Sequence, residues 1–213
     1  MLAQYDGSVH QQPAPTRRHR VPALAPDDRR AALIAATLPL LREHGAAVTT
    51  RQIAEAAGVA EGTIFGVFPD KASLLAAALA SALDQAPVLR ALSAIDPAAP
   101  LRERLGDVVA ILVRRVGSIL PLMMVARALP PDSAKPVLSL MLDGRQQLNQ
   151  AVAAVIEADR GLLRQSPDTI ARLLIALVLS SVRSEFNGPE ILSPDDIVSV
   201  LLDGLLKRPS GEA

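Results

Sequence analysis

Apolar residues recur every three or four positions along most of the 213-residue chain, which is the spacing of one face of an α-helix. The first such run begins after Pro26-Asp27-Asp28, where acidic side chains complement the unpaired N–H groups of a helix start. Pro39 lies inside the run and is expected to bend the helix. Gly45 closes it, where a left-handed residue is usually needed. The apolar positions of this run are Leu33, Ile34, Thr37, Leu38 and Leu41.

Two short helical stretches follow, over 50–57 and about 60–67, with Thr50 as the expected cap of the first. A further helix opens at Pro69-Asp70-Lys71 and runs to Ala82. The rest of the chain has the pattern of longer helices, and there is no internal repeat. These longer helices are expected over about 101–116, 118–129, 133–158, 167–186 and 193–206.

Composition divides the chain into five segments. Residues 1–25 mix Gln, Pro, Gly, Ser and His with little apolar periodicity and are predicted to be a disordered basic arm. Residues 26–85 hold the shorter helices, and the change in composition over 86–100 predicts a hinge. Residues 101–208 then form a second helical domain, and 209–213 a disordered tail.

The amino-acid content predicts an all-α protein. Half of the residues are hydrophobic, yet only four are aromatic and none is Trp. The apolar half is therefore mostly Ala and Leu, which favour helices over strands. The absence of cysteine excludes disulfides and cysteine-ligated metals. Because 22 Lys and Arg balance 22 Asp and Glu, binding to nucleic acid would need a local basic patch.

The charge pattern also bears on location. The longest stretch free of Asp, Glu, Lys and Arg is 72–83, which is shorter than the roughly 20 residues that a membrane span needs. The N-terminus lacks the apolar stretch of a secretory signal. We therefore expect a soluble cytoplasmic protein.

The segment from Thr49 to Lys71 carries the most information about function. Two short helices that cross steeply need small residues where they meet, and Ala54 and Ala57 supply them. Gly58 permits the positive φ of a sharp turn. This is the pattern of a helix-turn-helix, whose second helix enters the major groove of DNA. The alternative is an αα-hairpin in a helical bundle. The apolar residues that would fix both helices to a third are Ile53, Val59, Ile64 and Val67.

Three phrases in this segment keep a fixed spacing: Ile53-Ala-Glu-Ala-Ala-Gly-Val59, Gly62-Thr63-Ile64-Phe65 and Phe68-Pro-Asp-Lys71. With the preceding helix and Leu74-Leu75, they resemble the DNA-binding domain of TetR-family transcriptional regulators over residues 28–75, about a quarter of the chain. The resemblance implies an N-terminal three-helix helix-turn-helix domain joined to a C-terminal helical bundle that dimerises and binds ligand. It also implies a homodimeric repressor that a small molecule releases from a palindromic operator.

The resemblance further implies roles for single residues. Thr50 and Thr63 would bind phosphates, and Lys71 would neutralise one. Arg51 would reach a base edge, at guanine, and Gly62 would let the recognition helix approach the DNA backbone closely. The implied DNA-binding set is Thr50, Arg51, Ala60, Glu61, Gly62, Thr63, Phe65, Gly66 and Lys71.

Three positions depart from the family pattern. Position 65 is usually Tyr, whose hydroxyl reaches a phosphate, and Phe65 cannot make that bond. Gly66 and Val67 replace residues that are often polar or aromatic. Two interpretations of Glu61 stay open, an acceptor for cytosine N4 and a solvated charge at the helix start. Specificity is therefore predicted to rest on Arg51, on thymine-methyl contacts and on DNA shape.

The basic arm leaves two interpretations open. Arg17, Arg18 and Arg20 precede Arg29 and Arg30 at the start of the first helix. A flexible basic segment can enter the minor groove or pair with phosphates, and it can equally serve as a solubilising tail.

The C-terminal region contains a candidate pocket around 118–148, which holds three of the four methionines. Flexible thioethers suit a pocket for apolar ligands, and ordinary core filling is the alternative. Two arginines there are available to orient an anionic group. The candidate pocket residues are Leu120, Met123, Met124, Arg127, Met141 and Arg145.

The last two helices carry apolar residues on more than one face, which predicts packing against a partner subunit as well as against their own core. A purely intramolecular core is the alternative. The candidate interface residues are Leu174, Leu177, Val178, Ser181, Val198, Leu201, Leu202 and Leu205.

Enzyme motifs are missing from the sequence, so no catalysis, cofactor or metal is expected. The only histidines are His10, His19 and His44, and no serine-hydrolase, phosphate-loop or zinc-protease motif occurs. The expected partners are double-stranded DNA, a second copy of the chain and a small-molecule effector, with no membrane. The remaining rival is a helical ligand- or protein-binding dimer that keeps the fold but has weak or lost DNA binding.

Overall fold

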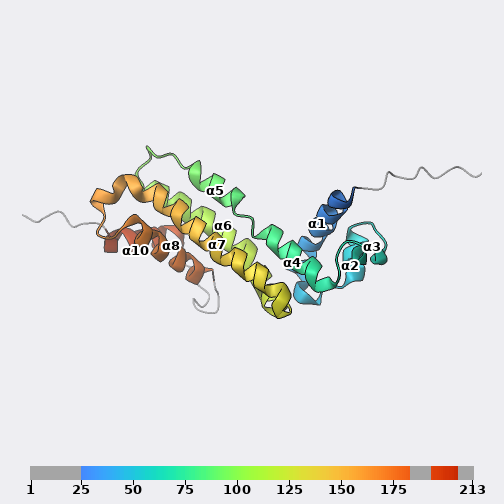
Figure 1. Ribbon diagram of the computed structural model, residues 1–213. Helices are drawn as coiled ribbons and strands as arrows, with labels where there is room; N and C mark the ends of the chain where they lie inside the picture. Colours follow the sequence, from blue (N-terminus) through green and yellow to red (C-terminus); the bar gives the residue numbers. More distant parts are fainter. Residues whose placement is uncertain (1–24, 183–192, 206–213) are drawn as a thin grey trace, which may run out of the picture.

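The computed structural model describes residues 25–182 and 193–205, which form helices and no strand. The all-α prediction is confirmed. In Figure 1 the molecule is elongated, with α1, α2 and α3 at one end, α4 in the middle and α5 to α10 toward the other end. The predicted arm (apart from Ala25) and tail lie outside the described residues. The helices are α1 (Pro26–His44), η1 (Gly45–Ala47), α2 (Thr50–Ala56), α3 (Glu61–Phe65), α4 (Lys71–Ala82), α5 (Ala86–Ser93), α6 (Leu101–Ala128), α7 (Pro131–Ile156), η2 (Glu157–Leu162), α8 (Pro167–Ser181) and α10 (Pro194–Leu205).

The N-terminal helices α1 to α4 share one hydrophobic core. Leu33 and Leu41 of α1 pack with Ile53 of α2, Ile64 of α3 and Leu74 of α4, and all are almost fully buried. Pro39 lies within α1, which continues to His44. The same core includes residues of α6 and α7, so the N-terminal helices pack on the end of the C-terminal bundle where those two helices meet. These residues are Leu122, Val125, Ala126, Leu129, Ala134 and Val137.

The C-terminal helices α5 to α8 and α10 build a second core from leucine, valine and isoleucine. Among the described residues, one charged side chain is buried with them: Arg104 of α6, of which 4% is exposed. Its guanidinium donates to the Val155 carbonyl oxygen at 2.7 Å and pairs with the carboxylate of Asp159. Arg104 therefore ties α6 to the end of α7 and to η2.

Helix α6 is a single helix of 28 residues, and the expectation of separate helices over 101–116 and 118–129 is wrong. Gly117 costs about 1 kcal/mol relative to alanine in a helix, and Pro121 has no N–H to donate. Both are exposed. Buried Leu112 and Leu122 on either side hold the helix in the two cores, and this packing outweighs the local preference.

The expected hinge at 86–100 contains a helix in its first half. Helix α5 starts with Ala86-Pro87, and proline is well tolerated at that position because a first-turn N–H has no partner within the helix. Val88 and Leu92 lie one turn apart and are buried in the C-terminal core. The non-helical part of this segment is confined to residues 94–100, which form turns and bends.

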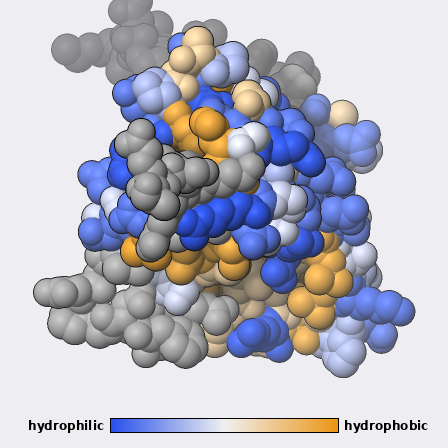
Figure 2. Space-filling view, turned by 90° about the vertical axis from the view of Figure 1, so that its left-hand side faces the viewer, coloured by the Kyte–Doolittle hydropathy of each residue, from blue (hydrophilic) through white to orange (hydrophobic). Residues whose placement is uncertain are grey.

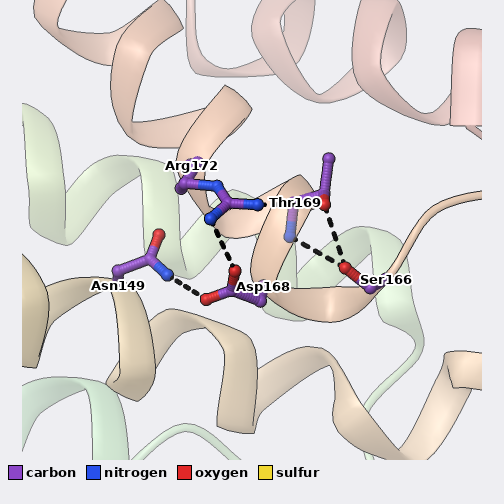
Figure 3. A network of polar contacts seen from close by, with 5 residues as sticks. All are labelled: Asn149, Ser166, Asp168, Thr169 and Arg172. Carbon is purple, nitrogen blue, oxygen red and sulfur yellow. Dashed lines mark hydrogen bonds and ion pairs between the residues drawn. The ribbon is translucent and has the colours of Figure 1, made fainter.

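Helix α8 is fixed to α7 by a polar network at its start (Figure 3). The Asn149 side-chain amide donates to the carboxylate of Asp168, which also pairs with Arg172 at 2.9 Å. Ser166 caps the helix, because its hydroxyl accepts the N–H of Thr169 at 3.2 Å. The predicted start of α8 at Pro167 is confirmed.

Two segments, 71–93 and 101–128, are long and apolar enough to cross a membrane when judged by length and composition alone. Core helices of soluble proteins pass the same test. Both segments contribute buried leucines and valines to the cores described above.

Candidate DNA-binding surface and ligand cavity

The first helix of the candidate motif, α2, begins with a capping box. The Thr49 hydroxyl accepts the N–H of Gln52 at 3.2 Å, and the Gln52 side chain accepts the N–H of Thr49 at 2.8 Å. The cap is therefore Thr49, and the prediction of Thr50 as cap is wrong by one position. Thr50 is instead the first helical residue, where its side chain is left available for another partner.

The turn between α2 and α3 has the predicted geometry. Gly58 has a φ of 65°, in the left-handed region where a side chain is disfavoured. The N–H of Val59 donates to the Ala54 carbonyl oxygen at 3.0 Å, which closes the turn. Ile53 and Ala54 are buried on one side of the turn and Ile64 on the other. Two short helices are thereby held at a fixed crossing.

The outer face of α3 is open to solvent. Ile64 is fully buried, so one side of the helix is anchored to the core. Phe65 is 52% exposed. Ala60, Glu61, Gly62 and Gly66 are exposed around it, and Thr63 is half-buried. This surface lies at the end of the molecule farthest from α10 in Figure 1. A nucleic-acid duplex can approach it there without meeting the C-terminal bundle.

A hydrogen bond joins the beginnings of α2 and α3. The Thr50 hydroxyl donates to the carboxylate of Glu61 at 2.5 Å. One carboxylate oxygen of the exposed Glu61 is thus occupied, while the other still has acceptor capacity, so both interpretations of this residue stay open. The resemblance implies that the Thr50 hydroxyl binds a DNA phosphate. In this structure the hydroxyl already donates its hydrogen bond to Glu61.

The start of α4 is fixed by two side chains. The Asp70 carboxylate accepts the N–H of Ser73 at 2.7 Å, and this hydrogen bond lowers the pKa of Asp70. The stabilising effect of this cap is therefore present near neutral pH and is lost as the pH falls through the lowered pKa. Lys71 donates to the Ala46 carbonyl oxygen at 3.1 Å. Lys71 therefore stays beside the turn that precedes α2.

The charge of this domain is close to neutral. Residues 26–82 contain five Arg and Lys and six Asp and Glu. One of the five cations, Arg30, lies over the ring of Phe68 at 4.3 Å from its centroid, an arrangement that favours a positive charge. Affinity for a polyanion must therefore come from a few well-placed cations or from segments outside 26–82.

The C-terminal bundle contains a cavity of about 540 Å³, partly open to solvent, between α6, α7 and α8. Four of the six predicted pocket residues line it: Leu120, Met123, Met141 and Arg145. The other two do not. Met124 is 65% exposed and Arg127 is also exposed on α6, because the periodicity of α6 turns both away from α7.

Sequence reasoning missed two polar residues of the cavity wall, Gln85 and Arg115. The Gln85 side chain packs on Gly144 so closely that a Cβ at position 144 would lie 2.4 Å from its amide nitrogen. The sequence signal for this contact was Gly144, a small residue in an otherwise leucine-rich helix. Arg115 gave no signal, because exposed and cavity-facing arginines look alike in a helical pattern.

The predicted interface residues of α8 and α10 mostly point inward. Six of the eight are buried in the chain itself, so their side chains are not available to a partner, and Leu177 is half-buried. The side chain of Leu205 lies outside the described residues. Exposed apolar positions are instead Leu173 and Leu179 of α8 and Val200 of α10. The six buried residues are Leu174, Val178, Ser181, Val198, Leu201 and Leu202.

Comparison with known proteins agrees with this architecture. Residues 33–78 match the model of the family described as bacterial regulatory proteins, tetR family. Among curated protein sequences, none matches the chain at a significant level. The class defined by the fold and the exposed α3 is thus a helix-turn-helix protein. Residues 33–78 of the N-terminal domain are thus a helix-turn-helix domain of the TetR type.

Solved structures extend the similarity to the whole fold. A protein of Mesorhizobium loti assigned as a TetR-family transcriptional regulator is 16% identical, with a TM-score of 0.68 over 86% of this chain and 100% of that one. A protein of Saccharomonospora viridis assigned as a transcriptional regulator, in complex with choline, is 24% identical, with a TM-score of 0.65 over 85% and 100%. NalD of Pseudomonas aeruginosa, the secondary repressor of the MexAB-OprM multidrug efflux pump, is 22% identical, with a TM-score of 0.56 over 87% and 99%. The family model and these solved structures are all described as those of transcriptional regulators.

Proposed function

We propose that this protein is a ligand-responsive, DNA-binding repressor that acts in the cytoplasm. The observation that carries the proposal is the exposed outer face of α3, presented by a tightly closed helix-turn-helix. Had this face been buried against the C-terminal bundle, the helix could not have entered a groove. A homodimer would present two such helices to the two halves of a palindromic operator.

Within this proposal the residues divide into two kinds of contact. Arg51 reads a guanine edge, and the exposed ring of Phe65 contacts thymine methyl groups. Thr63 and Lys71 contact phosphates and set the register without reading sequence. Because few polar groups project from α3, the shape of the DNA supplies part of the specificity.

The direct test is a fluorescence-anisotropy titration of the full chain against DNA from upstream of its own gene, followed by footprinting. We expect saturable binding in the presence of competitor DNA and a palindromic protected region. Equal affinity for this DNA and for unrelated sequences would overturn the proposal.

Gly62→Ala separates folding from DNA binding. Nothing lies within 4 Å of a Cβ built at position 62, and alanine is favoured over glycine in a helix by about 1 kcal/mol. We expect unchanged or slightly higher stability by thermal denaturation. Operator affinity should fall several-fold, because the methyl group projects toward the DNA backbone. Gly117→Ala on α6 is the control and should leave operator affinity unchanged, since a Cβ there also meets nothing within 4 Å and the position lies outside the predicted DNA-binding set.

Deletion of residues 1–24, which lie outside the described residues, tests the arm. The near-neutral charge of 26–82 makes Arg17, Arg18 and Arg20 the largest local excess of cations. We expect weaker operator binding and a shallower dependence of log affinity on log salt concentration, by about 1 to 3 units of slope. An unchanged slope would assign the arm to solubility alone.

Dimerisation is proposed through the outward faces of α8 and α10. Leu173 and Ala176 of α8 are exposed and Leu177 is half-buried, which gives this helix an apolar outer stripe at helical spacing. Val200 of α10 is 64% exposed. Figure 2, which views that end of the molecule, shows groups of hydrophobic residues among hydrophilic ones.

Leu173→Glu should therefore convert a dimer to a monomer, because it places a charge within the apolar stripe. The mass would be measured by size-exclusion chromatography with light scattering. Met124→Glu adds the same charge at an exposed apolar position of α6 and should leave the dimer intact. A dimer that survives Leu173→Glu would place the interface elsewhere.

The effector is proposed to be an apolar or amphipathic molecule bound in the cavity. A volume of about 540 Å³ falls within the range of roughly 300–1,000 Å³ typical of small-molecule sites. The similar fold of a choline complex and of an efflux-pump repressor supports this assignment. An effector that binds the free protein more tightly than the DNA-bound one must weaken DNA binding by the same factor.

A second candidate function, a helical ligand-binding dimer without specific DNA binding, is favoured by the near-neutral charge of 26–82 and by Phe65, Gly66 and Val67. The same titration distinguishes it. A dimer that binds ligand but no genomic fragment above background would support this candidate.

A further inference from the structure

The wall of the cavity has an unbalanced charge. Leucine, isoleucine, valine and methionine make up most of it, and Arg115 and Arg145 contribute two guanidinium groups. No Asp or Glu is found among the described residues that line it. An apolar cavity whose only charges are positive is complementary to an apolar molecule with an anionic group.

Arg115 is the more deeply placed of the two cations. It is half-buried on α6, and burial lowers its pKa, while the charge of Asp84 opposes this shift. Its two terminal nitrogens donate to the carbonyl oxygens of Ala82 and Asp84 at 3.0 and 2.9 Å. Its Nε is buried and has no hydrogen-bond partner among the described residues.

Arg115 forms no ion pair within the part of the chain that the structure describes. Backbone carbonyls satisfy two of its five N–H donors but do not neutralise its charge. Asp84 opposes the effect of burial without forming an ion pair with Arg115, so part of the cost of desolvating this cation remains. An anionic group in the cavity would remove this cost through a charge-assisted, bidentate hydrogen bond.

The Arg115 side chain also connects the cavity to the DNA-binding half of the molecule through its hydrogen bonds to Ala82 and Asp84. Ala82 is the last residue of α4, and Asp84 follows it before α5. Helix α4 packs in the N-terminal core with α1 and α3. Movement of the Arg115 guanidinium toward a ligand would therefore weaken its hold on the C-terminal end of α4.

We propose that the effector is an amphipathic organic anion whose carboxylate-type group binds Arg115, and that Arg115 transmits its occupancy to α4. This inference rests on the proposed function, because it names the chemistry and the relay of the same cavity. The apolar body of the ligand contacts Met123 and Met141, whose flexible side chains adapt to its shape.

The test uses three probes with one tail and different head groups: dodecanoate, dodecanol and dodecyltrimethylammonium, each below its micelle concentration. Affinity for the full-length protein is measured by isothermal titration calorimetry at neutral pH. We expect dodecanoate to bind at least about tenfold more tightly than the other two, the ratio that one charge-assisted hydrogen bond supports. Equal affinities, or a preference for the ammonium probe, would overturn the proposal.

Arg115→Gln keeps a polar side chain and removes the charge, and Arg127→Gln removes the same charge outside the cavity. The first should abolish the preference for dodecanoate over dodecanol, and the second should preserve it. Thermal denaturation establishes that each variant is folded. Should Arg115→Gln unfold, Arg115→Lys keeps the charge and loses the bidentate fork, so the preference for dodecanoate should fall without vanishing. A preference unchanged in the folded Arg115 variant would refute the assignment.

DNA release is measured separately, by adding each probe to the protein bound to its footprinted operator. Dodecanoate should release the wild type and the Arg127 variant but not Arg115→Gln. Failure to bind any operator in the absence of probe would count against the proposed function alone. Specific operator binding combined with release by all three probes would count against this inference alone.

Discussion

Arg104→Met is expected to lower the free energy of unfolding by about 3–5 kcal/mol, the cost of removing one partner of a buried ion pair. The methionine preserves most of the apolar stem but leaves Asp159 without its counter-ion and the Val155 carbonyl without its donor. Both groups lie where α7 passes into η2, so the loss affects the packing of α6 on α7. Urea denaturation followed by circular dichroism would measure it.

The control for this prediction is Arg102→Met, two residues earlier on the same helix. Arg102 is exposed and donates to the Ser199 hydroxyl at 3.1 Å. A surface change of this kind is usually worth within about 0.5 kcal/mol. Similar losses for the two variants would mean that the Arg104 pair does not fix α6 to α7.

The N-terminal half was predictable from sequence because its constraints are local. A positive φ at Gly58, a proline-initiated α1 and an aspartate cap at α4 each depend on residues within one or two turns. The fixed spacing of the three phrases predicted the family of the N-terminal domain, which the match over residues 33–78 confirms. Even there, the cap of α2 was predicted at Thr50, one residue too late. Thr49 and Thr50 have the same chemistry, and only the capping box with Gln52 distinguishes them.

The C-terminal half was less predictable because its constraints are distant in sequence. Leu173 and Leu174 are adjacent and chemically identical, yet one is 43% exposed and the other is fully buried. A helix that is apolar on several faces does not reveal which face its own core takes. Arg104 and Arg115 likewise find partners 31 to 55 residues away, which no local pattern encodes.

The second large effect is expected on operator binding, when Arg51 in the DNA-binding half is substituted. Arg51→Ala should weaken operator binding by about 1–3 kcal/mol, roughly 5- to 150-fold, and should relax the preference for guanine at one position of each half-site. Arg51 is exposed in the first turn of α2. Truncation there should therefore leave thermal stability unchanged. Anisotropy titrations against the operator and against single-base variants would measure both changes.

Arg42→Ala is the matched control, because it removes the same charge from an exposed position in the last turn of α1. A contact to a base edge loses sequence discrimination when it is removed, whereas loss of a general charge weakens all sequences equally and lowers the salt dependence. We expect only the Arg51 variant to bind the operator and its single-base variants with similar affinity. Uniform weakening by both variants, with discrimination intact, would make Arg51 a phosphate contact and would leave the recognition of bases to α3 and to DNA shape.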